Sequence, residues 1–245
     1  FEVERMEPLF ENQFAYDEFT KRHSSHHVKT ADIASYKGNC YLGIDAGSTT
    51  TKVALVDEDG NLLYSFYSSN NGSPLATTIK AIKEIYTLLP PEAKIVQSCS
   101  TGYGEALIKS ALMLDEGEVE TVSHFYAAAF FDPEVDCIID IGGQDTKVII
   151  VENNFVSDFI MNDKCSAGTG KFIEVMANRL GVTIDELFDM AKKGETVKIS
   201  SLCTVFAESE VISFIGKGAK REDIAAGVVD SVASKVSTLC NKKKL

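Results

Sequence analysis

The pattern of apolar and polar residues predicts the same strand–turn–strand unit twice. Ile44–Lys52 reads IDAGSTTTK and Ile139–Lys147 reads IDIGGQDTK, 95 residues further along the chain. Apolar runs precede and follow both segments, as expected for strands on either side of a tight polar turn. Ordinary turns rarely repeat both their polar residues and their flanking strands. The repeat therefore indicates an α/β protein built from two topologically similar halves.

Apolar spacing also predicts the elements that follow each repeat. Ser73-Pro74 is a helix start, because a capping hydroxyl precedes proline at the first helical position. Thr183 with Glu186 is a capping box at the start of another helix. The other predicted elements are strands near 62–68, 94–99 and 154–161 and helices near 104–113, 119–131, 171–180, 204–215 and 221–240.

The order of these elements divides the chain into three parts. Residues 1–39 carry mixed charge and no sustained period, so we expect a linker or the tail of a preceding domain. The first α/β half is expected at 40–134 and the second at 135–245.

Composition narrows the class of protein. Hydrophobic residues make up 44% and charged residues 24% of the 245 positions, as in ordinary globular proteins. The net charge of −12 argues against a nucleic-acid surface, which needs a basic patch. No apolar run approaches membrane-spanning length, and the N-terminus has neither the basic start nor the apolar segment of a signal peptide. We therefore expect a cytoplasmic protein that binds neither nucleic acid nor membrane.

The repeated turns carry residue types that bind phosphate. Asp45 and Asp140 are each followed two residues later by glycine, which lets the backbone approach a ligand closely. The glycine, serine and threonine residues of the turns then offer amides and hydroxyls to phosphate oxygens. Two such hairpins, one in each half, would enclose a nucleoside triphosphate.

Two of the six cysteines differ from the rest in their setting. No pair has C-x-x-C spacing, which excludes a zinc ribbon or a ferredoxin-type run. Thiols in or beside apolar stretches behave as small buried hydrophobes, and these are Cys40, Cys99, Cys137 and Cys240. Cys165 and Cys203 instead follow polar loops at predicted helix starts, where the helix dipole stabilises a thiolate or an anionic cluster. From the residues alone, Cys165 and Cys203 could be either structural cysteines or ligands of an iron–sulfur cluster. A cubane cluster needs four thiolates, which a two-fold homodimer would supply.

Five segments carry a specific combination of motifs, which in chain order read DAGSTTTK, STGYG, DIGGQDTK, NDKCSAGTGKF and SLCTVFAESEVIS. Together they resemble the ATP-dependent activators of 2-hydroxyacyl-CoA dehydratases, a family of BadF/BadG/BcrA/BcrD type that includes ATPase subunits of benzoyl-CoA reductase. The resemblance runs from about Tyr41 to the C-terminus. It implies an actin-like (ribonuclease H-like) ATPase fold with a nucleotide cleft between its duplicated α/β halves.

The resemblance also implies a redox function. It suggests a homodimer bridged by one [4Fe–4S] cluster, with Cys165 and Cys203 of each subunit as ligands. ATP binding and hydrolysis would shift the helices that carry the cluster, so that a low-potential electron passes to a partner dehydratase. Reduced ferredoxin or flavodoxin would be the donor, in anaerobic metabolism.

Residue roles follow from the turns and the resemblance together. The residues expected to hold the β- and γ-phosphates are Gly47, Ser48, Thr49 and Thr50 on one side and Gly142, Gly143 and Gln144 on the other. Asp45 and Asp140 would hold Mg²⁺ directly or through water. Gln144 would position the attacking water, Lys52 would pair with a phosphate, and Gly102 of the STGYG segment would contact the nucleotide.

The end of the chain departs from the family pattern. Members have a further glycine-rich loop after the long helix, which grips the adenosine, and this sequence ends at Leu245 before one. We therefore expect a fragment of a larger protein with incomplete contacts to base and ribose. The alternatives to a redox activator are a small-molecule kinase of the same superfamily and a non-catalytic module of a longer chain.

Overall fold

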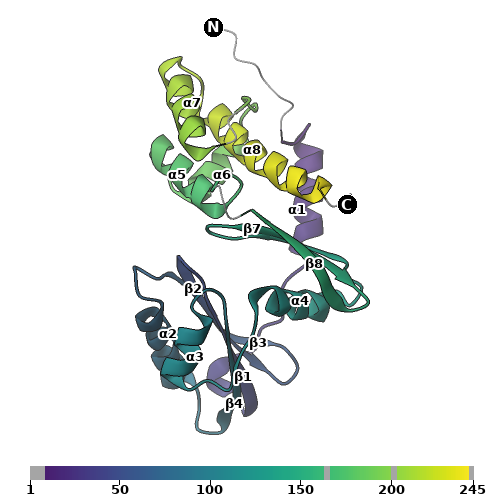
Figure 1. Ribbon diagram of the computed structural model, residues 1–245, viewed down its shortest axis with the longest axis vertical. Helices are drawn as coiled ribbons and strands as arrows, with labels where there is room; N and C mark the ends of the chain where they lie inside the picture. The colour runs from purple at the N-terminus through teal and green to yellow at the C-terminus, as the bar shows by residue number, and fades with distance from the viewer. Residues whose placement is uncertain (1–8, 163–165, 200–202, 243–245) are drawn as a thin grey trace. The chain divides into compact units, whose positions relative to one another are not determined.

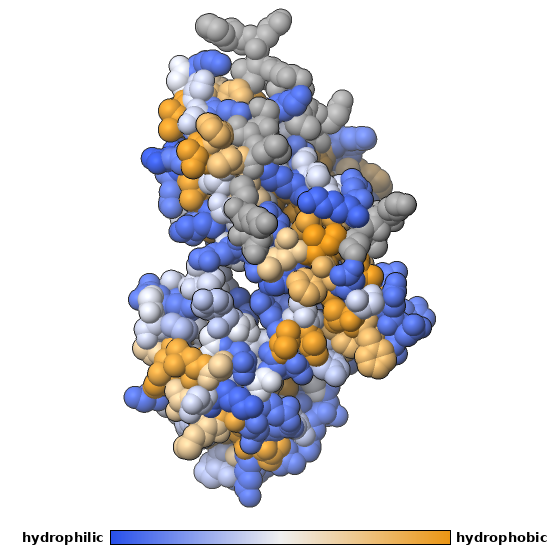
Figure 2. Space-filling model, in the orientation of Figure 1, coloured by the Kyte–Doolittle hydropathy of each residue, from blue (hydrophilic) through white to orange (hydrophobic). Residues whose placement is uncertain are grey.

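The computed structural model describes residues 9–162, 166–199 and 203–242. The chain divides into two compact units. The first is formed by residues 26–135, and the second by the described residues of 1–25 and 136–245. Each unit contains one copy of the repeated hairpin (Figure 1). Hydrophilic and hydrophobic residues are interspersed over the face shown in Figure 2.

The first unit, as described, contains a five-stranded sheet in the order β3-β2-β1-β4-β5. The first three strands form an antiparallel meander, whereas β4 runs parallel to β1 and β5 parallel to β4. The strands are β1 (Gly38–Ala46), β2 (Thr50–Asp57), β3 (Leu62–Ser69), β4 (Ala93–Thr101) and β5 (Glu116–Gly117). The helices are α2 (Pro74–Leu88), α3 (Glu105–Leu112) and α4 (Glu120–Phe131).

One face of this sheet is buried beneath α2 and α3. Buried side chains such as Ile44 and Val53 alternate with more exposed ones along β1 and β2, because successive residues of a strand point to opposite faces. They form one hydrophobic core with Ile85 of α2 and Ile108 of α3. The opposite face therefore carries Asp45 and Lys52 of the hairpin.

The second unit combines a three-stranded sheet, in the order β6-β7-β8, with the remaining described helices. The strands are β6 (Cys137–Ile141), β7 (Thr146–Glu152) and β8 (Phe155–Asn162). The helices are α1 (Gln13–Ser24), α5 (Gly170–Leu180), α6 (Ile184–Ala191), α7 (Thr204–Gly216) and α8 (Arg221–Asn241). Phe172, Met176 and Leu187 are fully buried where these helices pack. None of the helices in the described ranges is long and apolar enough to cross a bilayer.

The predicted helix starts are confirmed. Ser73 Oγ accepts a hydrogen bond from the Ala76 N–H at 3.3 Å, and Pro74 is the first residue of α2. At α6, Thr183 Oγ1 accepts from the Glu186 N–H and the Glu186 carboxylate accepts from the Thr183 N–H, which together form the capping box.

The duplication extends beyond the turn motifs. In the first unit the register between β2 and β3 shifts between Leu55 and Val56. In the second unit the register between β7 and β8 shifts between Ile150 and Val151, the equivalent pair of residues in the repeat. The two meanders therefore share an irregularity of strand pairing that no turn chemistry requires.

The N-terminal residues, expected to form a linker or the tail of a preceding domain, include a helix. α1 has no buried residue, and its N-cap Asn12 and its basic last turn stabilise it locally. Such a helix lacks the apolar stripe by which helices are recognised in sequence. Residues before β1 also join the first unit, because Ala31 and Ile33 pack on its core and Thr30 bridges to Leu62.

Asp57 at the end of β2 organises the turn that follows. Its Oδ1 accepts hydrogen bonds from the Asp59 and Asn61 N–H groups at 2.9 and 2.8 Å, and its Oδ2 accepts from Asn61 Nδ2 at 2.8 Å. Burial acts to raise the pKa of Asp57, but hydrogen bonds from Asn61, Asp59 and Gly60 outweigh it and hold the pKa below its usual value.

Replacing this carboxylate should destabilise the protein in a pH-dependent way. We expect Asp57→Asn to lower the free energy of unfolding by about 1–2 kcal/mol at pH 7, because a charged acceptor is lost. The folded pKa lies below the unfolded value of about 3.9, so this contribution is complete above that pH and disappears as the pH falls through the folded pKa. Urea unfolding at a series of pH values measures it, with Asp59→Asn as the exposed control. A difference that does not shrink in acid would contradict the assignment.

Candidate functional site

The first hairpin places a carboxylate opposite a lysine at the polar end of the sheet. Asp45 of β1 and Lys52 of β2 are partners in the register, and Lys52 Nζ lies 2.9 Å from Asp45 Oδ2. The Lys52 side chain remains 45% exposed, so its ammonium has donors left for a ligand. At Gly47 a Cβ would lie only 3.0 Å from the Thr50 carbonyl oxygen, so the turn leaves little room for a side chain there.

The loop between β4 and α3 packs against the same aspartate. Gly102 has φ +87°, and a Cβ there would lie 2.5 Å from Asp45 Oδ1 and 2.9 Å from the Ala46 carbonyl oxygen. The Gly104 N–H donates to that same carbonyl at 2.8 Å. Asp45 Oδ1 is buried and has no hydrogen-bond partner among the described residues. A carboxylate oxygen in this state suits Mg²⁺ or a water bound to it.

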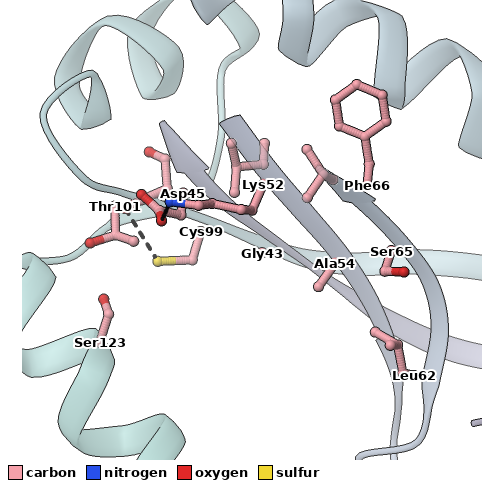
Figure 3. A pocket seen from close by; sticks show the side chains of 13 residues that line it. Gly43, Asp45, Lys52, Ala54, Leu62, Ser65, Phe66, Cys99, Thr101 and Ser123 are labelled. Atoms are coloured by element: carbon pink, nitrogen blue, oxygen red, sulfur yellow. Dashed lines mark hydrogen bonds and ion pairs between the residues drawn. The ribbon is translucent and has the colours of Figure 1, made fainter. Parts of the chain in front are cut away.

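A cavity of about 550 Å³ lies on the sheet face that α2 and α3 leave uncovered. Its floor is a row of small residues that are neighbours across four strands, and these are Cys99, Gly43, Ala54 and Ser65. Figure 3 shows Asp45, Lys52 and Thr101 together at one end, with Ser123 of α4 across the hollow. Burial raises the pKa of the Cys99 thiol, and neighbouring glutamates add to it, so this cysteine is held neutral.

The second hairpin repeats the aspartate–lysine pair in a more buried form. Asp140 of β6 and Lys147 of β7 are register partners, with Lys147 Nζ 3.5 Å from Asp140 Oδ2. Lys147 Nζ also lies 3.1 Å from Asp145 Oδ2, and its side chain is only 6% exposed. Asp145 stands where the first hairpin has Thr50. Two carboxylates thus compensate this buried lysine, which makes it a structural cation rather than a ligand contact.

The N-terminal end of α5 forms hydrogen bonds with the turn of the second hairpin. The N–H groups of Gly170 and Lys171 donate to the carbonyl oxygens of Gly142 and Gly143, each at 2.9 Å. A Cβ at Gly170 would lie 3.3 Å from the Gly142 oxygen, so the helix end lies directly on the turn. Gln144 is exposed in this turn, where a side chain can reach a ligand.

Equivalent threonines attach each hairpin to the segment after its third strand. Thr51 Oγ1 donates to Asn70 Oδ1 at 2.6 Å, and Thr146 Oγ1 donates to the Gly168 carbonyl at 2.7 Å. Both threonines are buried. The threonine repeated in the two sequence motifs therefore has a structural task in both units.

Of the two proposed cluster ligands, the structure describes one. Cys203 is the N-cap residue of α7, half-buried, and its side chain makes no capping hydrogen bond. Cys165 lies outside the described residues. Next to these positions, Ser166 Oγ and Thr204 Oγ1 are 2.8 Å apart, so the segments that follow the two cysteines are joined. A thiol at a helix N-terminus, not used for capping, fits a metal–thiolate ligand.

Proteins of similar sequence identify the family of this chain. Residues 42–244 match the BadF/BadG/BcrA/BcrD ATPase family. The chain belongs to this family. The (R)-2-hydroxyglutaryl-CoA dehydratase activating ATPase of Acidaminococcus fermentans is 42% identical over 203 residues, which cover 82% of this chain and 77% of that protein. The resemblance inferred from the five sequence segments is thereby confirmed.

Solved structures of family members have the same fold. Component A of (R)-2-hydroxyglutaryl-CoA dehydratase from A. fermentans has a TM-score of 0.75 at 39% identity, covering 84% of this chain and 79% of its own. The activator of 2-hydroxyisocaproyl-CoA dehydratase from Clostridium difficile, with bound ADPNP, has a TM-score of 0.76 at 39% identity, covering 83% and 75%. The predicted actin-like α/β class is confirmed, while the cleft between the halves stays a prediction.

Three residues of the hairpin environment are not singled out by the sequence. Asp145 and Gly170 support the second turn, and Asn70 contacts the first. The offset of the repeat could have flagged Asp145, because it marks where the two turns differ. Asn70 and Gly170 act through contacts distant in sequence, for which the motifs hold no signal.

A pair of glycines allows the contact with Asp45 to be tested. Gly72 has φ +84° and open space within 4 Å of where a Cβ would lie, whereas Gly102 has φ +87° and a Cβ there would meet Asp45. We expect Gly72→Ala to cost about 1 kcal/mol from backbone strain alone. Gly102→Ala should cost about 1–3 kcal/mol more, because both Asp45 and the Ala46 carbonyl must move. Urea unfolding measures both, and equal losses would show that the Asp45 contact is unimportant.

Proposed function

We propose that this chain is an ATP-dependent activator that drives low-potential electron transfer to a 2-hydroxyacyl-CoA dehydratase-type partner. The observation that carries the proposal is the repeated hairpin, in which Asp45 keeps a buried oxygen without a hydrogen-bond partner among the described residues. An activating ATPase of such a dehydratase is 42% identical to this chain, and another activator was solved with bound ADPNP.

The nucleotide part of the proposal assigns one task to each turn. The amides and hydroxyls of residues 47–50 would contact the β- and γ-phosphates, and residues 142–144 would contact them from the second unit. Asp45 and Asp140 would hold Mg²⁺, and Lys52 would pair with a phosphate. Gln144 would orient the attacking water, and Gly102 would let the backbone of its loop lie close to Asp45.

The redox part assigns the cluster to Cys165 and Cys203. Each subunit of a homodimer would supply these two thiolates to one [4Fe–4S] cluster, which would carry the low-potential electron. Cys203 supports this role because its thiol is half-buried at the start of α7 and is not engaged in capping. Reduced ferredoxin or flavodoxin would supply the electron.

A continuous set of hydrogen bonds supports coupling between the two parts. The second turn is bonded to Gly170 and Lys171, at the start of α5. In the preceding segment Thr169 Oγ1 donates to the Ser166 carbonyl at 2.6 Å, and Ser166 Oγ lies 2.8 Å from Thr204 Oγ1. Thr204 directly follows Cys203. Movement of the turn on nucleotide binding would therefore be transmitted to the segments beside both proposed cluster ligands.

Iron and sulfide analysis after anaerobic purification tests the cluster. We expect about four iron atoms per dimer, the content of one cubane held by four thiolates. Cys165→Ser and Cys203→Ser should each abolish it, because either change removes two ligands from the shared cluster.

Cys240→Ser is the matched control, since this half-buried thiol on α8 has no assigned role and its loss should leave the iron content unchanged. Iron-free dimers of the wild type would refute the redox part. Transfer of labelled γ-phosphate to a small molecule by iron-free protein would favour a kinase instead.

A further inference from the structure

Asn70 makes more contacts with the first turn than any motif suggests. It directly follows β3 and is 4% exposed. Its Nδ2 donates to the Gly47 carbonyl at 2.8 Å, and its backbone N–H donates to the Thr49 carbonyl at 2.9 Å. Its Oδ1 accepts from the buried Thr51 hydroxyl at 2.6 Å. A single buried residue thus bonds to the turn at both of its ends.

These bonds fix the direction of the amides that matter for a phosphate. In a trans peptide the carbonyl oxygen of one residue and the N–H of the next point in opposite directions, and the described chain has no cis peptide. Holding the Gly47 oxygen toward Asn70 therefore points the Ser48 N–H away from it. Holding the Thr49 oxygen does the same for the Thr50 N–H.

The second turn achieves the same result with different groups. There the N–H groups of α5 hold the carbonyls of Gly142 and Gly143, so the N–H groups of Gly143 and Gln144 point away from the helix. Within the described ranges, neither of these N–H groups nor that of Ser48 donates a hydrogen bond. Both turns thus have their carbonyls occupied from behind and amides left for a ligand.

We propose that Asn70 is a positioning residue for the first phosphate loop: its side-chain amide orients the Ser48 N–H toward the phosphates, and its backbone N–H does the same for the Thr50 N–H. This inference rests on the proposed nucleotide function. It assigns to one residue in the first unit the task that the first turn of α5 performs in the second.

Asn70→Asp isolates the side-chain donor. The variant keeps the size of the residue, its backbone bond to Thr49 and an acceptor for Thr51, but it turns an oxygen toward the Gly47 carbonyl. We expect the dissociation constant for Mg–ADPNP to rise about tenfold, because one hydrogen bond is lost and two acceptors face each other. Isothermal titration of the full chain measures it. Asn70→Ala should have a similar effect.

Asn61→Ala is the matched control. Asn61 lies at the opposite end of β2, where its Nδ2 donates to Asp57 Oδ2 at 2.8 Å and its N–H to Oδ1 at 2.8 Å. Its loss should lower the unfolding temperature of the protein but change the nucleotide affinity by less than about twofold. Thr51→Val leaves both bonds from Asn70 to the turn in place, and it should affect stability more than affinity.

Amide hydrogen exchange of the ligand-free protein gives a second readout. We expect the amide of residue 70, which is bonded to the Thr49 carbonyl, to exchange about tenfold faster in Asn70→Asp, because the loosened turn opens more often, and to keep its wild-type rate in Asn61→Ala. If Asn70→Asp lowers only the unfolding temperature and leaves affinity and exchange at wild-type values, Asn70 is a structural residue and the proposal is wrong. Wild-type protein that does not bind ADPNP would instead overturn the nucleotide function itself.

Discussion

The strand register within each hairpin is the constraint on which the polar sites depend. Because side chains alternate between faces, pairing Asp45 with Lys52 keeps both on the face opposite Ile44 and Val53. A slip of one residue would place Asp45 in the core and Ile44 outside it. The apolar residues beneath α2 therefore determine on which face the carboxylate lies.

The two units share the hairpin register but support the hairpin turn with different groups. In the first unit the turn is supported by a side chain that follows β3, whereas in the second it is supported by the main chain of α5. A side-chain support can be altered by one substitution without disturbing a helix. A main-chain support moves only when the helix moves, which links the second turn, and not the first, to Ser166 and Thr204 beside the two cysteines.

Most of the fold could be predicted from the sequence because its elements are marked locally. A few consecutive residues are enough to recognise the repeated turns, the Ser73-Pro74 helix start and the capping box at Thr183. The structure confirms all of them. α1 could not be predicted, because a cap, terminal charges and aromatic contacts such as Phe10 with Tyr16 replace an apolar stripe.

The site could be predicted only in part, for a similar reason. Asp45 and Lys52 are seven residues apart in a recognisable motif, whereas Asn70 reaches Gly47 across a separation of 23 residues. Nothing in the segment SSNNGS separates Asn70 from Asn71. In the structure Asn70 is buried against the turn, while Asn71 is an exposed residue with φ +45°. Only the packing of β3 beside β2 decides between them.

The buried lysine of the second hairpin has a consequence for charge. In the first hairpin Lys52 pairs with one aspartate, so the formal charges of these two side chains cancel. In the second hairpin Lys147 pairs with both Asp140 and Asp145, so the three side chains carry a net charge of one negative unit. A polyphosphate approaching that turn meets repulsion from the hairpin's own side chains unless a cation lies between them. The second turn would thus need a divalent cation before it could admit a phosphate, whereas in the first turn the metal held by Asp45 would add to amides that already attract the phosphate.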